Sequence, residues 1–337
     1  MAFTRFARVL APIVGLVLLL ASCGGGDTST GGSGSSSDLK VAAIFSGSTT
    51  DADYNSLGLL ALQAAEKNRG AQIAYSENVA VPDAERVMRE YLAEGYNVIW
   101  SHGSQFAEAS VRLARQNPDV TFIAEFDDKP QEQLDNLWVI DRNFHVGFYP
   151  IGVLAGAATK TGKIGYVGGL SLPFSYSEVH AMKQALRDTG SSAEVTAVWT
   201  GDFNDPAKAQ QITTQLLDQG HDVIVGSLNL GMVGAFQAVK DRPGNVIITA
   251  KYTDKSQFDP AHYATSVIYD FTQPLDDVLG QIATGTRSGY YPLGFQTGVR
   301  IQDLQNVDPS VVSAVEKAVN DVRSGAVNVV KDHSPVQ

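Results

Sequence analysis

The chain has 337 residues, of which 36 are Asp or Glu and 25 are Lys or Arg, so its formal net charge is −11. This balance excludes the basic surface that a nucleic-acid-binding protein needs for its phosphate contacts. The single cysteine excludes an internal disulfide. Because one hydrophobic core stops growing at about 250–300 residues, a chain of this length is expected to form two lobes.

The first residues of the chain combine positive charge with a short apolar run. Arg5 and Arg8 precede the apolar residues 9–21, and small residues stand directly before Cys23. The run is shorter than the roughly 20 residues of a membrane-spanning helix and has the length typical of a signal peptide. We therefore expect residues 1–22 to be a lipoprotein signal peptide and Cys23 to be acylated after cleavage. The alternative is a buried or reactive thiol, which the residues before the cysteine do not favour.

A segment of almost pure Gly, Ser and Thr follows the cysteine. This composition cannot bury apolar surface, so residues 23–38 are expected to form a flexible tether that begins at the acylated cysteine. Acyl chains on Cys23 would anchor the protein, and no second apolar segment of spanning length follows. The sequence thus predicts a lipid-anchored protein on the extracytoplasmic face of the cell membrane.

Short β-branched runs alternate with longer amphipathic segments along the rest of the chain. Strands that alternate with helices form parallel sheets, so the fold class is predicted to be α/β. The first series of strands is expected at residues 40–45, 73–75, 98–100 and 121–124. The pattern restarts after residues 147–159, and further strands are expected at residues 164–167, 194–199, 223–225 and 246–249.

An internal similarity supports two lobes of one design. Residues 92–99 and 217–224 share a pattern of helix end, glycine and buried strand, and a proline stands near the start of each preceding helix. Chance similarity of two generic units is the alternative, and we interpret the match as duplicated lobe architecture. Asp205, which precedes Pro206, is expected to cap its helix.

The alternation predicts two doubly wound α/β lobes joined by a hinge, with the ligand cleft between them. The first lobe is expected to contain residues 39–143 plus about 271–300, and the second lobe residues 144–270. Residues 301–337 are expected to pack on the lobes as a C-terminal segment and tail. The chain is expected to cross between the lobes near residues 269–274 and 290–298.

The sequence gives little support for catalysis. Its six histidines do not have the His-x-x-x-His or Cys/His spacing of a zinc site. Phosphate-loop, dinucleotide-binding and nucleophile-elbow motifs are absent from the sequence. Residues 101–104 contain His102 beside two serines but no obvious acid to orient it, which favours a polar turn over a triad. We expect a binding protein without metal or cofactor, and not an enzyme.

The loops after the predicted strands combine aromatic rings with amide, hydroxyl and carboxylate groups. Aromatic faces sandwich a flat ring, and polar groups fix its orientation, so these loops suit a flat polar ligand. For any single aromatic residue, packing in the core is an equally good interpretation. The candidate ligand-binding residues are Tyr54, Asn55, Ser104, Phe106, Asp127, Phe174, Phe203, Asn229, Tyr252 and Asp254.

From about Leu39 to Ala326 the chain resembles the basic membrane protein family of ABC-transporter substrate-binding lipoproteins. The resemblance rests on Asp51 to Gly58, Glu77-Asn78-Val79, Asn143-Phe144 through Leu154-Ala155-Gly156, Gly168-Gly169 with Pro173, Asp205-Pro206, Gly220-His221-Asp222-Val223-Ile224 and Thr265-Ser266-Val267. It implies a type I periplasmic-binding fold, ABC transporter permease subunits as partners and a purine nucleoside as a ligand. We expect a monomer.

Two positions depart from the nucleoside-binding members of that family. Tyr252 stands where they carry an acid suited to ribose hydroxyls, and Tyr269 stands where they tend to carry a lysine. The chain is more similar to a branch associated with free nucleobases such as adenine, and Tyr269 joins the candidate residues on this ground. A purine base or nucleoside is the first expectation. The alternatives are another small polar solute, such as a sugar or other heterocycle, and a ligand-sensing partner of a membrane receptor.

Overall fold

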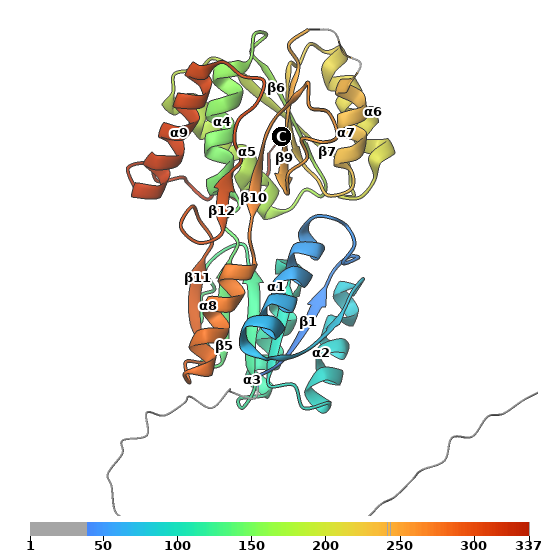
Figure 1. Cartoon of the computed structure of the whole chain (residues 1–337), viewed down its shortest axis with the longest axis vertical. Coiled ribbons are helices and arrows are strands. Elements are labelled where there is room, and N and C mark those ends of the chain that lie inside the picture. The colour runs from blue at the N-terminus through green and yellow to red at the C-terminus, as the bar shows by residue number, and fades with distance from the viewer. Residues whose placement is uncertain (1–38, 241, 243, 337) are drawn as a thin grey trace, which may run out of the picture. The chain divides into compact units, whose positions relative to one another are not determined.

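The computed structural model describes residues 39–240, 242 and 244–336. The predicted signal peptide, Cys23 and the tether lie outside these residues. The described part of the chain contains two sheets of six strands each, with helices on both faces of each sheet (Figure 1). Each sheet with its helices is called a lobe below.

The sheet of the first lobe is entirely parallel, with the strand order β11-β5-β4-β3-β1-β2. Its strands are β1 (Lys40–Phe45), β2 (Gln72–Ser76), β3 (Val98–His102), β4 (Thr121–Phe126), β5 (Leu137–Asp141) and β11 (Gly289–Pro292). Its helices are α1 (Tyr54–Arg69), α2 (Ala84–Ala93), α3 (Ala107–Gln116) and α8 (Thr272–Ala283), with short 3-10 helices η1 (Val81–Asp83) and η2 (Ser104–Phe106).

Side-chain alternation along β1 explains why both faces of this sheet are covered. Val41, Ala43 and Phe45 pack in the same core cluster as apolar residues of α1 and α8. Ala42 and Ile44 point to the opposite face and pack in a cluster with residues of α2 and α3. A central parallel strand that is buried on both faces is therefore a continuous run of apolar residues in the sequence.

The second lobe repeats this arrangement with the strand order β12-β10-β9-β8-β6-β7. Its strands are β6 (Lys163–Gly168), β7 (Glu194–Trp199), β8 (Val223–Ser227), β9 (Ile247–Tyr252), β10 (Tyr263–Tyr269) and the antiparallel β12 (Val299–Ile301). Its helices are α4 (His145–Ala158), α5 (Pro173–Asp188), α6 (Pro206–Asp218), α7 (Met232–Lys240) and α9 (Pro309–Ser324). Helices α4, α5 and α9 share one core cluster, and α6 and α7 share another.

The eight predicted strands are all present, and six of them are two residues longer than predicted. The two similar segments are confirmed as equivalent units, since Gly95 and Gly220 adopt positive φ angles of 83° and 86° between a helix end and a buried strand. Asp205 caps α6 as predicted, because its side chain accepts a hydrogen bond from the backbone N–H of Lys208 at 2.9 Å.

Two strands of the first lobe were not predicted. β5 has the same length as β3 and β8, but no helix lies between it and β4, so the alternation of strands with helices did not point to it. β11 carries both a glycine and a proline and lies at the edge of its sheet, where proline is tolerated.

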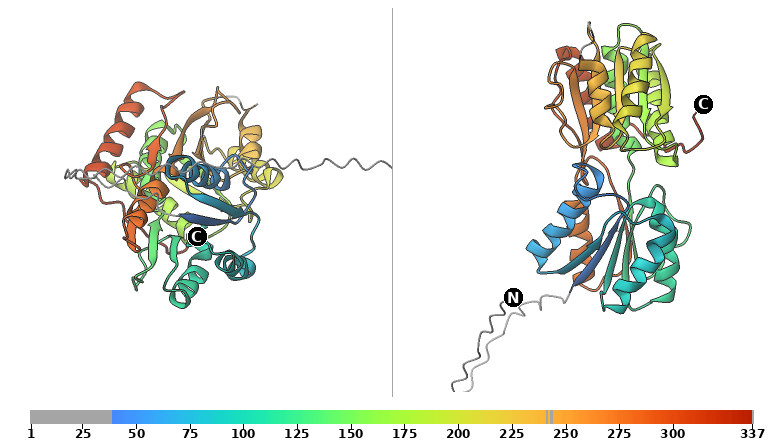
Figure 2. Two further views of the ribbon diagram at one scale, coloured as in Figure 1. Left: turned by 60° about the horizontal axis from the view of Figure 1, so that its bottom comes forward. Right: turned by 90° about the vertical axis from the view of Figure 1, so that its right-hand side faces the viewer.

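Three segments connect the lobes: β5 to α4, β10 to α8, and β11 to β12 (Figure 2). The last two are hydrogen-bonded to each other, since the N–H of Asp270 donates to the carbonyl of Gly298 at 2.7 Å. Gly298 has a φ of +104°, and a Cβ there would lie 2.4 Å from the Asp270 carbonyl oxygen, so only glycine fits. Because β12 begins at residue 299, the chain returns to the second lobe slightly before the predicted limit of about residue 300.

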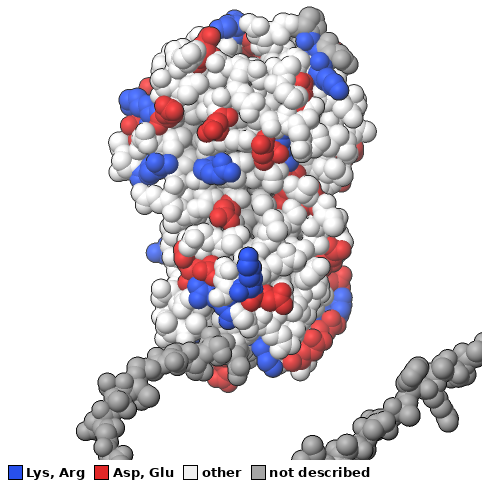
Figure 3. Space-filling view, in the orientation of Figure 1, with Lys and Arg blue, Asp and Glu red and all other residues white. Residues whose placement is uncertain are grey.

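The C-terminal part of the described chain packs mainly on the second lobe. Helix α9 shares a core cluster with α4, and the N–H of Val330 donates to Gln184 on α5 at 2.9 Å. Lys331 then reaches the first lobe, where its Nζ lies 2.7 Å from a carboxylate oxygen of Asp141. On the face shown in Figure 3, basic and acidic side chains are interspersed, and no continuous basic surface forms among the described residues there.

No helix among the described residues is both long and apolar enough to cross a membrane.

Candidate ligand-binding site

Loops at the carboxyl ends of both sheets line one cavity of about 710 Å³. Parallel α/β sheets bind ligands at this edge, because the loops there vary without disturbing the sheet. The lining residues from the first lobe are Ser46, Gly47, Tyr54, Asn55, Val81, Ser104, Gln105, Ala107, Phe126, Asp127 and Arg142. Those from the second lobe are Leu170, Leu172, Pro173, Phe174, Phe203, Asn204, Asn229 and Tyr252.

The first-lobe wall of the cavity centres on the guanidinium of Arg142. Its Nε donates to Asp127 at 2.9 Å, and its Nη2 donates to Asp127 and, at 2.7 Å, to the hydroxyl of Ser104. Its Nη1 donates to the hydroxyl of Tyr54 at 3.2 Å. The Ser104 hydroxyl in turn donates to the second oxygen of Asp127 at 2.7 Å. Four side chains that follow four different strands are therefore fixed relative to one another.

Two buried side chains, Glu125 and His102, hold Tyr54 in this wall. The hydroxyl of Tyr54 donates to Glu125, and the second Glu125 oxygen lies 2.5 Å from Nδ1 of His102. The other ring nitrogen of His102 donates to the backbone carbonyl of Tyr54 at 2.8 Å, and the two rings stack with centroids 4.0 Å apart. The ring of His102 is therefore held between the Glu125 side chain and the Tyr54 backbone.

The prediction from the sequence that no acid orients His102 is wrong, because Glu125 of the neighbouring strand supplies one. Strands β3 and β4 are adjacent in the sheet although 23 residues separate the two side chains in sequence. The contacts nevertheless exclude a nucleophilic triad here, since Ser104 is hydrogen-bonded to Asp127 and Arg142 and not to the histidine. The group positions the Tyr54 ring.

Asn55 completes the first-lobe wall at the start of α1. Its Nδ2 donates to Asp51 at 2.8 Å, and its Oδ1 accepts from the N–H of Gly47 at 3.2 Å. The same Asp51 carboxylate accepts from the backbone N–H groups of Asp53 and Ser56. The turn before α1 thus fixes the amide of Asn55 at the rim of the cavity.

The second-lobe wall is mainly aromatic and apolar. The rings of Phe174 and Phe203 are nearly parallel, with centroids 6.1 Å apart and an interplanar angle of 20°. Glycine makes this arrangement possible, because a Cβ on Gly169 would lie 2.1 Å from the Phe203 ring. The amides of Asn204 and Asn229 add polar groups to this wall.

Tyr252 forms the floor of the cavity at the end of β9, with a φ of +75°. A bulky residue in this region of φ is strained, and such strain is concentrated at functional sites. Behind it, the buried Nζ of Lys251 lies 2.5 Å from a Glu178 oxygen and 3.9 Å from the centroid of the Phe144 ring. Burial lowers the pKa of Lys251 to about 8, against the opposing attraction of the Glu178 charge.

A direct bond between the lobes lies beside this cavity. Lys255 of the second lobe approaches the Asp53 carboxylate to 2.5 Å, and the hydroxyl of Thr253 donates to the same oxygen at 3.0 Å. Both charged side chains are at most 5% exposed. Burial raises the pKa of Asp53 to about 6, and the Lys255 charge opposes this shift only in part.

Eight of the eleven predicted ligand-binding residues line the cavity: Tyr54, Asn55, Ser104, Asp127, Phe174, Phe203, Asn229 and Tyr252. Phe106 does not, because its side chain turns into the core between the sheet and α3. Asp254 is exposed outside the cavity and accepts from the N–H of Ser256 at 2.8 Å. Tyr269 is buried behind Tyr252, and its hydroxyl donates to the Phe144 carbonyl at 3.1 Å.

Arg142 is the main residue of the site that the sequence did not reveal. Arg142 directly follows β5. Because that strand was not predicted, the position of Arg142 at the carboxyl edge of the sheet was not predicted either. The family motif that begins at Asn143 is the sequence signal adjacent to Arg142.

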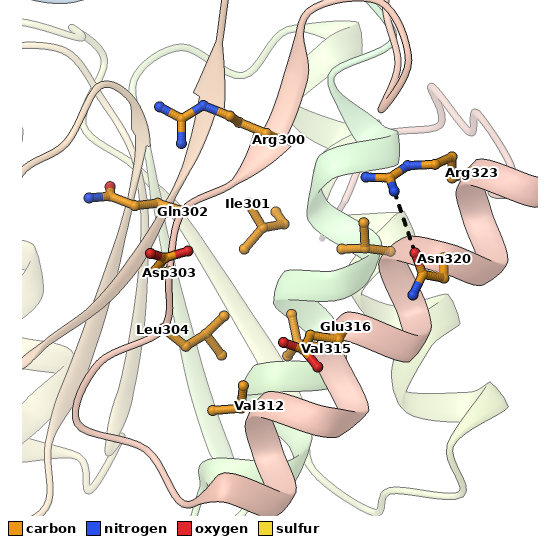
Figure 4. Close-up of a pocket in the computed structure, with 11 residues that line it drawn as sticks. Arg300, Ile301, Gln302, Asp303, Leu304, Val312, Val315, Glu316, Asn320 and Arg323 are labelled. Carbon is orange, nitrogen blue, oxygen red and sulfur yellow. Dashed lines mark hydrogen bonds between the residues drawn. The ribbon is translucent and has the colours of Figure 1, made fainter.

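A second hollow of about 530 Å³ lies entirely on the second lobe, between α9 and the segment that follows β12 (Figure 4). Arg300, Asp303, Glu316 and Arg323 place opposite charges around its apolar floor. This hollow receives no residue from the first lobe and no loop from the carboxyl end of a parallel strand. The cavity between the lobes is therefore the candidate site.

Comparison with known proteins identifies the family. A model described as "Bmp: ABC transporter substrate-binding protein PnrA-like" matches residues 39–330. A purine-binding protein of Brucella abortus is 25% identical over 260 residues, which cover 76% of this chain and 72% of that protein. An ABC transporter nucleoside-binding protein of Lactococcus lactis is 23% identical over 348 residues, covering 96% of this chain and 98% of that protein.

Solved structures agree with this assignment. A solute-binding protein of an ABC transporter system from Conexibacter woesei superposes with a TM-score of 0.69 and 25% identity over 87% of this chain and 99% of that one. One from Aeropyrum pernix gives a TM-score of 0.76 at 19% identity, with coverages of 88% and 94%, and shows the fold alone. The predicted periplasmic-binding fold and the predicted non-enzymatic, solute-binding role are thereby confirmed. The chain belongs to the Bmp family of PnrA-like ABC transporter substrate-binding proteins.

Proposed function

We propose that this protein binds a purine base or nucleoside in the cavity between its lobes and delivers it to the permease subunits of an ABC importer. The observation that carries the proposal is the contrast between the two walls: a stacked aromatic pair on one side, and fixed hydrogen-bonding groups on the other. This combination suits a planar heterocycle with polar edges. The cavity volume also falls within the usual range of about 300–1,000 Å³ for small-molecule sites.

Two relatives support this ligand class, since one is named a purine-binding protein and the other a nucleoside-binding protein. Isothermal titration calorimetry with adenine, guanine, adenosine and guanosine tests the proposal, with glucose and galactose as the competing class. We expect saturable binding of at least one purine. If the purified protein binds a sugar and none of the purines, the ligand assignment is wrong although the family remains.

Closure of the lobes around the ligand is the mechanism we propose for capture. Residues of both lobes line the cavity, and only a closed arrangement lets both walls contact one small molecule. The three connecting segments, and the pair formed by Asp270 and Gly298 in particular, would serve as the hinge. Small-angle scattering should show a smaller radius of gyration when ligand saturates the protein, and an unchanged radius would argue against closure.

We also propose that Cys23 is acylated and holds the protein, as a monomer, on the extracytoplasmic face of the membrane. The run of residues before this cysteine supports the proposal, and a relative from Pyrococcus horikoshii, 27% identical over 320 residues, is named a lipoprotein. Cys23→Ala should move the protein from the detergent phase to the aqueous phase in a phase-partition experiment. Wild-type protein already found in the aqueous phase would refute the anchor.

A further inference from the structure

Arg142 lies where the hydrogen-bonding wall, the aromatic wall and a hinge segment meet. It follows the last residue of β5 and precedes the crossing to α4. Its guanidinium carbon lies 4.8 Å from the centroid of Phe144 and 4.9 Å from that of Phe174, which belongs to the second-lobe wall. With a side-chain exposure of only 5%, the group is packed against rings as well as hydrogen-bonded.

Four of the five N–H groups of this guanidinium donate to side chains of the described residues, and one does not. The group carries five N–H bonds. Two of them donate to Asp127, one to Ser104 and one to Tyr54. The fifth, on Nη1, has no acceptor among the described residues, and Arg142 lines the cavity. A buried charged donor without an acceptor is costly, so a ligand that supplies one gains affinity.

The neighbouring carboxylate offers the complementary group. One oxygen of Asp127 accepts from Arg142, and the other accepts only from Ser104 among the described residues. A carboxylate oxygen accepts more than one hydrogen bond. The wall therefore presents a donor that cannot accept, on Arg142, and an acceptor that cannot donate, on Asp127, and the hydroxyl of Ser104 bonds both side chains.

We propose that Arg142 is a specificity-determining residue that requires a hydrogen-bond acceptor on the ligand, while Asp127 accepts from a ligand donor. This inference rests on the proposed function and refines it. The matching ligand edge is an amide or amidine, such as N1 with the amino group of an aminopurine, or N1–H with the carbonyl of an oxopurine. A heterocycle without the acceptor leaves the Nη1 donor buried and unpaired, and sites of this kind reject such analogues strongly.

Ligand analogues that lose or weaken only the acceptor separate this role from a purely structural one. We would measure Kd values of wild type, Arg142→Gln and Arg142→Lys for adenine with 1-deazaadenine, and for hypoxanthine with its 6-thione, which keeps N1–H and replaces the oxygen by a weaker acceptor. Of these two comparisons, the one whose parent base binds more tightly to wild type decides the role of Arg142. Wild type should prefer the parent base by about tenfold or more. Arg142→Gln should reduce this preference to less than about threefold, with Arg142→Lys between the two.

Two further variants keep the result interpretable. Arg142→Gln combined with Asp127→Asn avoids an unpaired buried carboxylate, so it keeps the test available if the single variant folds poorly. Arg300→Gln makes the same chemical change in the hollow of Figure 4, outside the cavity, and should leave all four Kd values unchanged.

The proposal is overturned if Arg142→Gln weakens parent base and analogue by the same factor, or if wild type does not distinguish them. Either result leaves the proposed function intact, since purines still bind. Failure of wild type to bind these bases and also adenosine and guanosine would instead refute the purine assignment itself.

Discussion

The two walls of the cavity differ in what holds their side chains in place. On the first-lobe wall, hydrogen bonds among charged and hydroxyl groups fix Tyr54, Ser104, Asp127 and Arg142 in one geometry. On the second-lobe wall, close packing orients aromatic rings such as Phe203, which have no directional partner of their own. Stacking accepts any flat ring, whereas a fixed donor and acceptor accept few. Affinity and selectivity are therefore expected to come mainly from different lobes.

The largest effect is expected from breaking the first-lobe wall with Asp127→Ala. This change leaves the guanidinium of Arg142 buried without its carboxylate, and removing one partner of a buried ion pair costs about 3–5 kcal/mol of stability. Chemical denaturation should show a loss of that size, with binding abolished.

Glu132→Ala is the matched control, because it removes an ion pair with Arg115 whose side chains are 52% and 60% exposed. Exposed pairs contribute about 0–1 kcal/mol, so this variant should unfold close to wild type. Equal losses for the two carboxylates would show that the first-lobe wall is no more tightly organised than the protein surface.

The aromatic wall should behave in the opposite way. Phe203→Ala removes a ring that is only partly buried, so stability should change little. Binding should weaken about 5- to 150-fold, since stacking on an aromatic ring contributes about 1–3 kcal/mol per base. Titration calorimetry and thermal melting of the same samples measure both quantities.

Phe258→Ala controls for the general effect of losing a phenylalanine, because its ring is 39% exposed and lies outside the cavity. Its Kd should equal that of wild type. A large drop in the melting temperature of the Phe203 variant without loss of affinity would indicate a structural role instead.

Tyr252 offers a way to convert part of the aromatic wall into a hydrogen-bonding one. Tyr252→Asp places a carboxylate where the family resemblance implies an acid in nucleoside-binding members, and Asp tolerates the positive φ at this position better than Tyr. We expect the ratio of the Kd values for adenine and adenosine to shift about tenfold towards the nucleoside.

Tyr252→Asn has nearly the same size and the same tolerance of positive φ but carries no charge. It separates recognition of ribose hydroxyls by a carboxylate from simple enlargement of the cavity. If both variants shift the ratio equally, the added space and not the acid is responsible.

The smallest effect concerns the ion pair behind the aromatic wall. The pKa of Lys251 is lowered from its ordinary 10.5 to about 8, so between these pH values the unfolded chain binds more protons than the folded one. Stability should therefore rise with pH in this window, by at most about 1.4 kcal/mol per pH unit. Urea denaturation from pH 8 to 9 keeps most tyrosines protonated in both states, because their pKa in the unfolded chain is about 10.

Lys251→Met combined with Glu178→Gln removes both charges of this pair while preserving volume. The double variant should lose the dependence on pH, whereas wild type retains it. An unchanged slope would show that another group is responsible.

The sequence predicted most of the fold because most elements carry a local signal. The apolar run of β1, Gly95 and Gly220 at their helix ends, and Asp205 before Pro206 all act within a few residues of one another. Most of the cavity followed from the same signals, because the carboxyl end of a strand is known once the strand is.

The parts of the site that sequence did not reveal depend on contacts distant in the chain. The acid that supports His102 comes from the neighbouring strand, and Arg142 follows a strand that no helix separates from the strand before it. Phe106 and Phe203 are both phenylalanines in loops at strand ends, yet only one faces the cavity. Nothing in their local sequence distinguishes a ring packed under a helix from a ring exposed to a ligand.

The bond of Asp53 with Thr253 and Lys255 has a consequence for kinetics. It joins the lobes through protein atoms alone, so its free energy contributes equally to the capture of every ligand that the cavity accepts. Such a contribution changes residence time without changing the ranking of ligands, because it must be broken each time the lobes separate. Substitutions at these three residues would therefore tune how long any cargo is retained, independently of the walls that choose it.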